Sequence, residues 1–289
     1  MSRVFFFFPH WSRTAALGTL LLLPAAQAKP NVIVSFQPLF DVVTRVAEPH
    51  AAVERAAPLG ASPHDFDPTV RDIARIRSAD LAIMAGLGAD DWLERYVKAS
   101  GSPAKVLKLG NVMTFTRIRE GSATDPHWWL DARLMAQAAR TVGTHLAALD
   151  PQHAAAYRAN AEREAVRLTA LDAELRRTLV PVRGGKLVTF HNAFGYFARA
   201  YGLTVSATIT PLAGIEPSAQ RMAQTVQTIR TAGVRAVFAE PQLPQGPARA
   251  VAAEAGVPLF VLDPEGSVQT PNYADMMRRN RDTLLQALK

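Results

Sequence analysis

The stretch "PQHAAAYRANAEREAVRLTALDAELRRTL", residues 151–179, decides the fold because it separates two similar halves of the sequence. Alanine, leucine, arginine and glutamate, all strong helix formers, dominate it. It contains no glycine, and its one proline is the first residue, where a helix tolerates proline. A helix over these residues would be about 43 Å long at 1.5 Å per residue. We therefore expect one long helix joining two folded units.

Short apolar runs alternate with helical patterns on both sides of this segment, which predicts parallel strands covered by helices. The predicted strands are 31–36, 53–59, 81–86 and 105–109 before it, and 186–190, 204–209, 235–240 and 258–263 after it. Helices are predicted at 39–48, 68–78 and 90–100. The expected fold class is α/β, with two lobes, each a parallel-rich sheet flanked by helices, joined by one long rigid helix. The expected boundaries are an N-terminal lobe at 29–150, the linking helix at 151–181 and a C-terminal lobe at 182–289.

The first 28 residues have the pattern of a cleavable secretory signal peptide. Two arginines and no acid precede an apolar run, and Ala-Gln-Ala follows, which predicts cleavage after Ala28. The apolar run is too short to span a bilayer, which needs about 20 apolar residues. The sequence has no cysteine, so we expect no lipid-anchored cysteine, no thiolate metal site and no cysteine nucleophile. The expected product is a soluble periplasmic monomer and not a lipoprotein.

The formal net charge of +7 does not indicate a nucleic-acid partner. Basic residues are scattered among acids, as in "RDIARIRSAD", and no basic stripe with interleaved aromatic residues is present. We therefore expect a solvated basic surface and no nucleic-acid binding.

Three histidines and one aspartate stand where a strand or loop leads into the next element. His64 lies in "LGASPHDFDPTV", His127 in "TDPHWWLDAR" and His191 in "LVTFHNAFGY", while Asp263 directly follows the strand in "PLFVLD". Open α/β sheets bind ligands at the carboxyl ends of their strands. Three imidazoles and one carboxylate would suit tetrahedral Zn²⁺, and the excess of imidazole favours zinc over manganese.

Structural roles compete with this interpretation, because any one of these histidines taken alone is more often a structural residue. His50, His145 and His153 lie in polar contexts and are predicted to be surface residues. Asp67 and Asp131 each precede a helical pattern and are predicted to be helix N-caps.

Six motifs strengthen the hypothesis of a metal site, because of the order in which they follow one another along the sequence. They are "PHDFDP" (63–68), "DPHWWLD" (125–131), "FHNAFGYFARAYGL" (190–203), "GIEPSAQ" (214–220), "VFAEPQ" (237–242) and "VLDP" (261–264). Together they resemble the zinc/manganese family of solute-binding proteins that serve ABC transporters. The resemblance covers essentially the whole chain after the signal, and it implies two α/β lobes joined by one long helix.

The resemblance also implies which residues hold the ion. It makes His64, His127 and His191 metal ligands and gives Asp263 the place of the acidic fourth ligand, with Glu240 or a water as alternatives. Manganese-binding members tend to have a carboxylate at the position of His191, so zinc is the expected metal, with Mn²⁺ or Fe²⁺ as the alternative.

Partners follow from the same resemblance. We expect a binding protein, not an enzyme, that captures zinc with high affinity in the periplasm and delivers it to an ABC-transporter permease. The segment 109–126 has no histidine, although many zinc members have a His-rich loop there. A periplasmic metallochaperone is therefore a further candidate partner. Glu216 either stabilises a helix start or pairs with a base of the permease. A zinc hydrolase with three histidines is the alternative from another class, and it would need an open coordination position.

The resemblance extends to the surroundings of His127. Trp129 is expected to pack beneath the site and Trp128 to line the cleft, with packing in the core as the alternative for both. Asp125 or a backbone carbonyl is expected to accept the second ring N–H of a ligand histidine.

Overall fold

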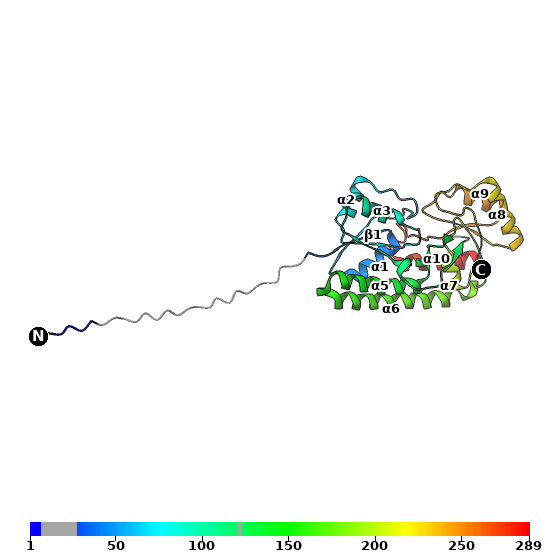
Figure 1. Cartoon of the computed structure of the whole chain (residues 1–289). Helices are drawn as coiled ribbons and strands as arrows, with labels where there is room; N and C mark the ends of the chain where they lie inside the picture. The colour runs from blue at the N-terminus through cyan, green and yellow to red at the C-terminus, as the bar shows by residue number, and fades with distance from the viewer. Residues whose placement is uncertain (7–27, 121–122) are drawn as a thin grey trace.

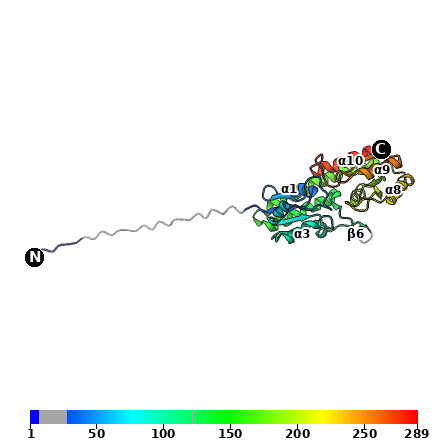
Figure 2. The same cartoon turned by 90° about the horizontal axis from the view of Figure 1, so that it is seen from above.

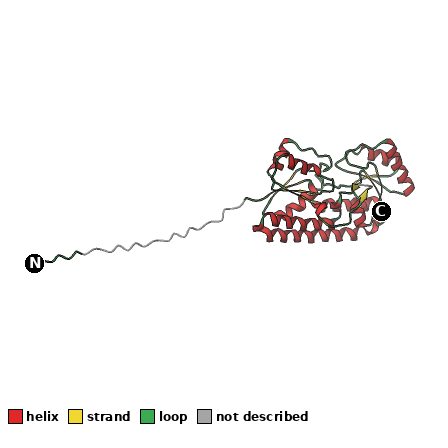
Figure 3. Ribbon diagram, in the orientation of Figure 1, coloured by secondary structure: helices red, strands yellow, loops and turns green. Residues whose placement is uncertain are grey.

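The computed structural model describes residues 1–6, 28–120 and 123–289, so most of the expected signal peptide lies outside the described residues. Two lobes stand side by side on a base of long helices (Figure 1). Each lobe contains a four-stranded parallel sheet, with strand order β2-β1-β3-β4 in the N-terminal lobe and β10-β9-β7-β8 in the C-terminal lobe. The expected fold class is confirmed: two parallel sheets, each flanked by helices (Figure 3).

The N-terminal half alternates strands with helices from its first element. Its strands are β1 (Asn31–Val34), β2 (Ala52–Arg55), β3 (Leu81–Met84), β4 (Lys105–Lys108), and the short antiparallel pair β5 (Arg119–Glu120) and β6 (Ala123–Thr124). Its helices are α1 (Gln37–Ala47), α2 (Val70–Arg77), α3 (Asp91–Ala99), α4 (Leu109–Val112), the 3₁₀ turn η1 (Trp128–Leu130) and α5 (Ala132–Leu149).

The C-terminal half repeats this alternation. Its strands are β7 (Lys186–Thr189), β8 (Thr204–Thr208), β9 (Val237–Ala239) and β10 (Leu259–Val261). Its helices are α7 (Gly195–Tyr201), α8 (Ala219–Ala232), α9 (Gly246–Ala255) and α10 (Tyr273–Leu288). Every strand predicted from the sequence overlaps an observed one, because short apolar runs bounded by polar or turn residues are a local signal.

The long central helix forms with shorter ends than expected. Pro151–His153 is a 3₁₀ turn (η2), α6 proper is Ala154–Thr178, and a second 3₁₀ turn (η3) covers Val180–Val182. α6 packs along α5 and also contacts α1 of the N-terminal lobe and α7 and α10 of the C-terminal half, so it underlies both lobes (Figure 1). Among the described residues, no helix combines the length and apolar character needed to cross a membrane.

The apolar core is shared between the halves. One cluster runs from the N-terminal sheet through α5 and α6 to α7 and α10. A smaller cluster fills the C-terminal lobe between its sheet and the pair α8 and α9. From above, α10 lies along the outer side of the C-terminal lobe and reaches toward α1 (Figure 2), and α1 and α10 are in contact. The two lobes are therefore packed against common helices.

The predicted helix caps have different outcomes. Asp131 is the N-cap of α5, and its carboxylate accepts a backbone N–H of the first turn. The prediction for Asp67 is wrong, because Thr69 caps α2 in a reciprocal capping box with Asp72. Asp67 instead accepts a hydrogen bond of 2.8 Å from the hydroxyl of Tyr96, which holds the loop before α2 against α3.

Gly143 on α5 provides a stability test of the helical base. A Cβ at this position would collide with the Cβ of Ala161 on α6 and approach the carbonyl of Tyr157. Gly143→Val should therefore destabilise the protein by about 1–3 kcal/mol through overpacking. Urea unfolding measures the loss, and the exposed Ala155→Val on α6 should cost less than about 0.7 kcal/mol. Equal losses in both variants would contradict the close packing of α5 and α6.

Candidate metal centre

The three predicted histidines come together between the lobes. His64 lies in the loop between β2 and α2, His127 directly precedes η1, and His191 follows β7 by two residues. The Nε2 atom of His127 is 3.0 Å from Nε2 of His64 and 3.2 Å from Nε2 of His191. One ligand atom from each residue lies within 4.8 Å of the others. The structure thus joins three supersecondary units through their imidazoles.

These distances fit a single ion held by three ring nitrogens. In a tetrahedral site with metal–nitrogen bonds of about 2.0–2.1 Å, two ligand nitrogens lie about 3.3 Å apart. The two nitrogen pairs at 3.0 and 3.2 Å come close to that edge length. His127 and His191 are buried and His64 is partly exposed, so the cluster opens to solvent on the side of His64.

Buried carboxylates stand behind two of the imidazoles. Oδ1 of Asp125 is 2.8 Å from Nδ1 of His127, and Oε2 of Glu240 is 2.6 Å from Nδ1 of His191. Each carboxylate also accepts the backbone N–H of the same histidine, at 2.9 Å and 3.0 Å. A carboxylate on Nδ1 fixes the ring tautomer and turns the Nε2 lone pair toward the centre.

The electrostatics of the cluster favour neutral imidazoles. Burial lowers the pKa of His64 well below its usual value, and the neighbouring His127 and His191 lower it further. Burial, with a contribution from His191, likewise lowers the pKa of His127. Because metal ions bind the unprotonated ring, these shifts keep the donors available at neutral pH. Burial also raises the pKa of Asp125 to about 7.

The role expected of Asp263 as the fourth ligand stays a prediction, and the structure shows what its carboxylate contacts. Its carboxylate organises its own loop and does not join the imidazole cluster. Oδ1 accepts hydrogen bonds from the side chain of Gln242 at 2.8 Å and from the backbone N–H groups of Glu265 and Gly266 at 3.1 and 2.8 Å. Oδ2 accepts one from the hydroxyl of Thr270 at 2.7 Å. Both oxygens are therefore committed to neighbouring donors.

Glu265, which the sequence analysis did not single out, faces the cluster instead. Its Oε1 atom lies 3.9 Å from Nε2 of His64 and 3.4 Å from the hydroxyl of Ser62. Its Oε2 atom is buried and has no hydrogen-bond partner among the described residues. Burial raises the pKa of Glu265 well above its usual value, and the nearby acids Glu240 and Asp263 add to this. A buried carboxyl without a full set of partners is a group that a cation would stabilise.

The two tryptophans next to His127 are both buried. The ring of Trp129 lies 5.1 Å from that of His127, and its indole N–H donates to the carbonyl of Pro264 at 2.8 Å. Trp128 donates to the carbonyl of Ala85 at 3.1 Å. Trp129 therefore packs against the imidazole, as expected, and also ties η1 to the loop that carries Glu265.

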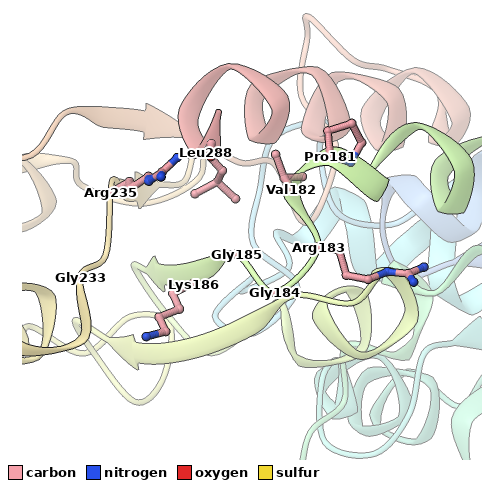
Figure 4. A pocket seen from close by; sticks show the side chains of 9 residues that line it. All are labelled: Pro181, Val182, Arg183, Gly184, Gly185, Lys186, Gly233, Arg235 and Leu288. Atoms are coloured by element: carbon pink, nitrogen blue, oxygen red, sulfur yellow. Dashed lines mark hydrogen bonds between the residues drawn. The ribbon is translucent and has the colours of Figure 1, made fainter.

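A hollow of about 310 Å³ lies away from the histidines, between the start of β7 and the end of α10 (Figure 4). Two of the positively charged side chains that line it already donate hydrogen bonds to backbone carbonyls. Lys186 donates to the carbonyl of Ala232 at 2.7 Å, and Arg235 donates to that of Leu288 at 2.8 Å. Arg183 points away from them (Figure 4). This hollow thus has the features of a helix-end contact and not of a metal site.

Two α/β lobes on a shared helical base, with an imidazole cluster where they meet, are typical of a solute-binding protein for a metal ion. The sequence model of the ZnuA family, described as "Zinc-uptake complex component A periplasmic", matches residues 32–287. The chain belongs to this family of metal-binding proteins, whose members are not enzymes and work with ABC-transporter permeases. Membership excludes the hydrolase alternative.

The relatives bind different metals, according to their names. The chain is 30% identical to the "Iron-binding protein YfeA" of Yersinia pestis, over 94% of this chain and 95% of that protein. It is 29% identical to the "High-affinity zinc uptake system protein ZnuA" of Paracoccus denitrificans, over 95% and 96%. The solved structure of the solute-binding protein FpvC of Pseudomonas aeruginosa with Mn²⁺ has a TM-score of 0.82 and 28% identity, over 90% and 98%.

Trp129→Phe tests the link between η1 and the loop that carries Glu265. The variant keeps an aromatic ring but leaves the buried carbonyl of Pro264 without its donor, so we expect a loss of about 1–3 kcal/mol in the free energy of unfolding. Tyr96→Phe, which removes an exposed hydrogen bond of the same length, should change stability by less than about 0.5 kcal/mol. Matching losses in urea unfolding would contradict a special contribution of the indole.

Proposed function

We propose that this protein captures Zn²⁺ with His64, His127 and His191 and delivers it to an ABC-transporter permease. One observation supports this most directly: the Nε2 atoms of His64 and His191, which come from separate segments, lie 3.0 and 3.2 Å from Nε2 of His127. The carboxylates behind His127 and His191 orient both rings for a ligand, a pairing that metal-binding histidines commonly have.

Zinc is the proposed cargo because of the donor set. Imidazole suits zinc, whereas carboxylate, carbonyl and water oxygens suit manganese. The inner position after β7 is an imidazole, His191, and not a carboxylate. Relatives named for iron and manganese show that the family accepts several metals, so Mn²⁺ or Fe²⁺ as cargo is the competing outcome.

Glu265 is the proposed fourth ligand, in place of Asp263. Asp263 already accepts hydrogen bonds at both carboxylate oxygens, and Glu240 is held by His191. Glu265 has a free buried oxygen and a second oxygen 3.9 Å from Nε2 of His64. Four protein ligands would close the coordination shell, which suits capture of an ion and leaves no position for an activated water. A water as fourth ligand is the alternative.

The proposed setting is the periplasm, reached by way of a signal peptide cleaved after Ala28, without a lipid anchor because the sequence has no cysteine. The proposed partner is the membrane permease, and the protein acts as a monomer. A periplasmic metallochaperone is a further proposed partner, since the segment 109–126 contains no histidine that would gather metal near the cleft.

Metal analysis of the untagged protein tests the choice of cargo. Protein purified from periplasm should contain zinc, and Zn²⁺ should displace Mn²⁺ in competition at equal concentrations. His191→Ala should weaken zinc binding by about 100-fold or more, since removal of a group that only supports a ligand already costs about 10–100-fold. His145→Ala, on the exposed side of α5, should bind zinc as the wild type does. A preference for Mn²⁺, or an equal loss of zinc affinity in both variants, would refute the proposal.

Substitutions of Glu265 and of Asp263 test which of the two carboxylates binds the ion. Glu265→Gln should lower zinc affinity by about tenfold or more while the apo protein keeps its stability, because the unpartnered carboxylate is the group facing the ion. Asp263→Asn should lower the stability of the apo protein by about 1–3 kcal/mol, because it weakens several buried hydrogen bonds. Calorimetric titration and urea unfolding measure both effects. If Asp263→Asn kept its stability and lost more affinity than Glu265→Gln, Asp263 would be the ligand.

A further inference from the structure

A second pair of histidines lies in the N-terminal lobe, away from the metal centre. His50 stands in the turn between α1 and β2, and His153 ends η2 just before α6. Their rings are stacked, with centroids 4.0 Å apart and planes 17° from parallel. Both residues are partly exposed. The turn that carries His50 leads into the amino end of β2, whereas the metal centre lies beyond the carboxyl ends of strands, so the pair is at the opposite edge of the sheet.

Asp150 fixes the ring of His153. Its Oδ2 atom accepts hydrogen bonds from Nδ1 of His153 at 2.7 Å and from the hydroxyl of the buried Tyr157 at 2.9 Å. Burial raises the pKa of Asp150, but these two hydrogen bonds outweigh it, so that the pKa lies below its usual value and the group is a carboxylate at neutral pH. With Nδ1 bound to this carboxylate, the neutral ring presents its lone pair on Nε2.

The same construction supports the imidazoles of the metal centre. Asp125 holds Nδ1 of His127 at 2.8 Å, and Glu240 holds Nδ1 of His191 at 2.6 Å. A carboxylate behind Nδ1 raises the basicity of the ring and fixes its orientation, which improves Nε2 as a metal ligand. The Asp150–His153 pair therefore repeats, at a partly exposed position, the arrangement found twice at the centre.

His50 supplies the second imidazole. Neither nitrogen of its ring has a hydrogen-bond partner among the described residues, and the centroid of the Tyr157 ring lies 6.0 Å from that of His50. Because a metal ion lies in the plane of each imidazole that binds it, the nearly parallel rings must tilt well away from their stacked arrangement for a nitrogen of each to reach a common ion. The partial exposure of both residues leaves room for that tilt.

We propose that His50 and His153 form a second site for a divalent transition metal, Zn²⁺ or Cu²⁺, with water completing the coordination. Imidazole suits both ions, and Cu²⁺ binds a given nitrogen site more tightly than Zn²⁺ does. Within the described ranges the pair has no third His, Asp or Glu donor close enough to form a three-residue group, so it binds more weakly than the centre between the lobes. Such a site lets the protein hold a second ion without competing for the first.

Zinc titration of the untagged apo protein, after residue 28, tests this site. The wild type should bind a first equivalent tightly and a second one more weakly. His50→Gln and His153→Gln should each lose the second equivalent and keep the first, whereas His191→Ala should lose the first and keep the second. Asp150→Asn should weaken the second equivalent by about 10–100-fold, because the carboxylate supports His153. His145→Gln, on the exposed side of α5, is the matched control and should change neither.

Nuclear magnetic resonance locates the second ion independently of stoichiometry. Cu²⁺ added to zinc-loaded protein should broaden the ring signals of His50 and His153 before that of His145. Circular dichroism of each variant checks that the fold is kept. A single equivalent of zinc in the wild type, a second equivalent that persists in both glutamine variants, or equal broadening of all exposed histidines would overturn the proposal. The His191→Ala variant, in which only the second equivalent should remain, separates a failure of this site from a failure of the centre between the lobes.

Discussion

The convergence of three ring nitrogens on one point is the constraint on which the rest of the structure depends. Nitrogen lone pairs about 3 Å apart repel one another unless a proton or a cation lies between them. The rings stay in place because Asp125 and Glu240 hold two of them through Nδ1 and through the backbone. The shared helices α5, α6 and α10 in turn keep the two halves that carry these pairs together.

Much of the fold could be predicted from the sequence because its signals are local. The segment 151–179 has the composition of a helix over its whole length, and only its ends differ, where two short 3₁₀ turns flank α6. The strands could be recognised as brief apolar runs. The cap at Asp67 was mispredicted because Thr69 forms a reciprocal bond with Asp72, and such a pair competes with any single upstream acid.

The three histidines of the centre could also be predicted, since each follows a strand or precedes a helix, where α/β sheets present their ligands. The acidic ligand is harder to predict from the sequence, and the assignment of Asp263 stays a prediction. Asp263 and Glu265 are two residues apart in one turn, and which of them faces the imidazoles depends on distant donors. Gln242 and Thr270 bind the carboxylate of Asp263, and this leaves Glu265 to face the cluster. His50 and His153 were predicted only as surface residues. Neither the stacking of their rings nor the hydrogen bond between Asp150 and His153 can be recognised from the local sequence.

The network around Asp263 has a consequence for functional screens. Six hydrogen bonds meet at this residue, four on its carboxylate and two between its backbone and the side chain of Asn280. Replacing it would disorder the turn that presents Glu265 and the carbonyl that receives Trp129. A survey that ranks positions only by impaired uptake would therefore score Asp263 beside the proposed metal ligands. A residue that binds the ion can be distinguished from one that only supports the loop if the stability of each variant is measured together with its uptake.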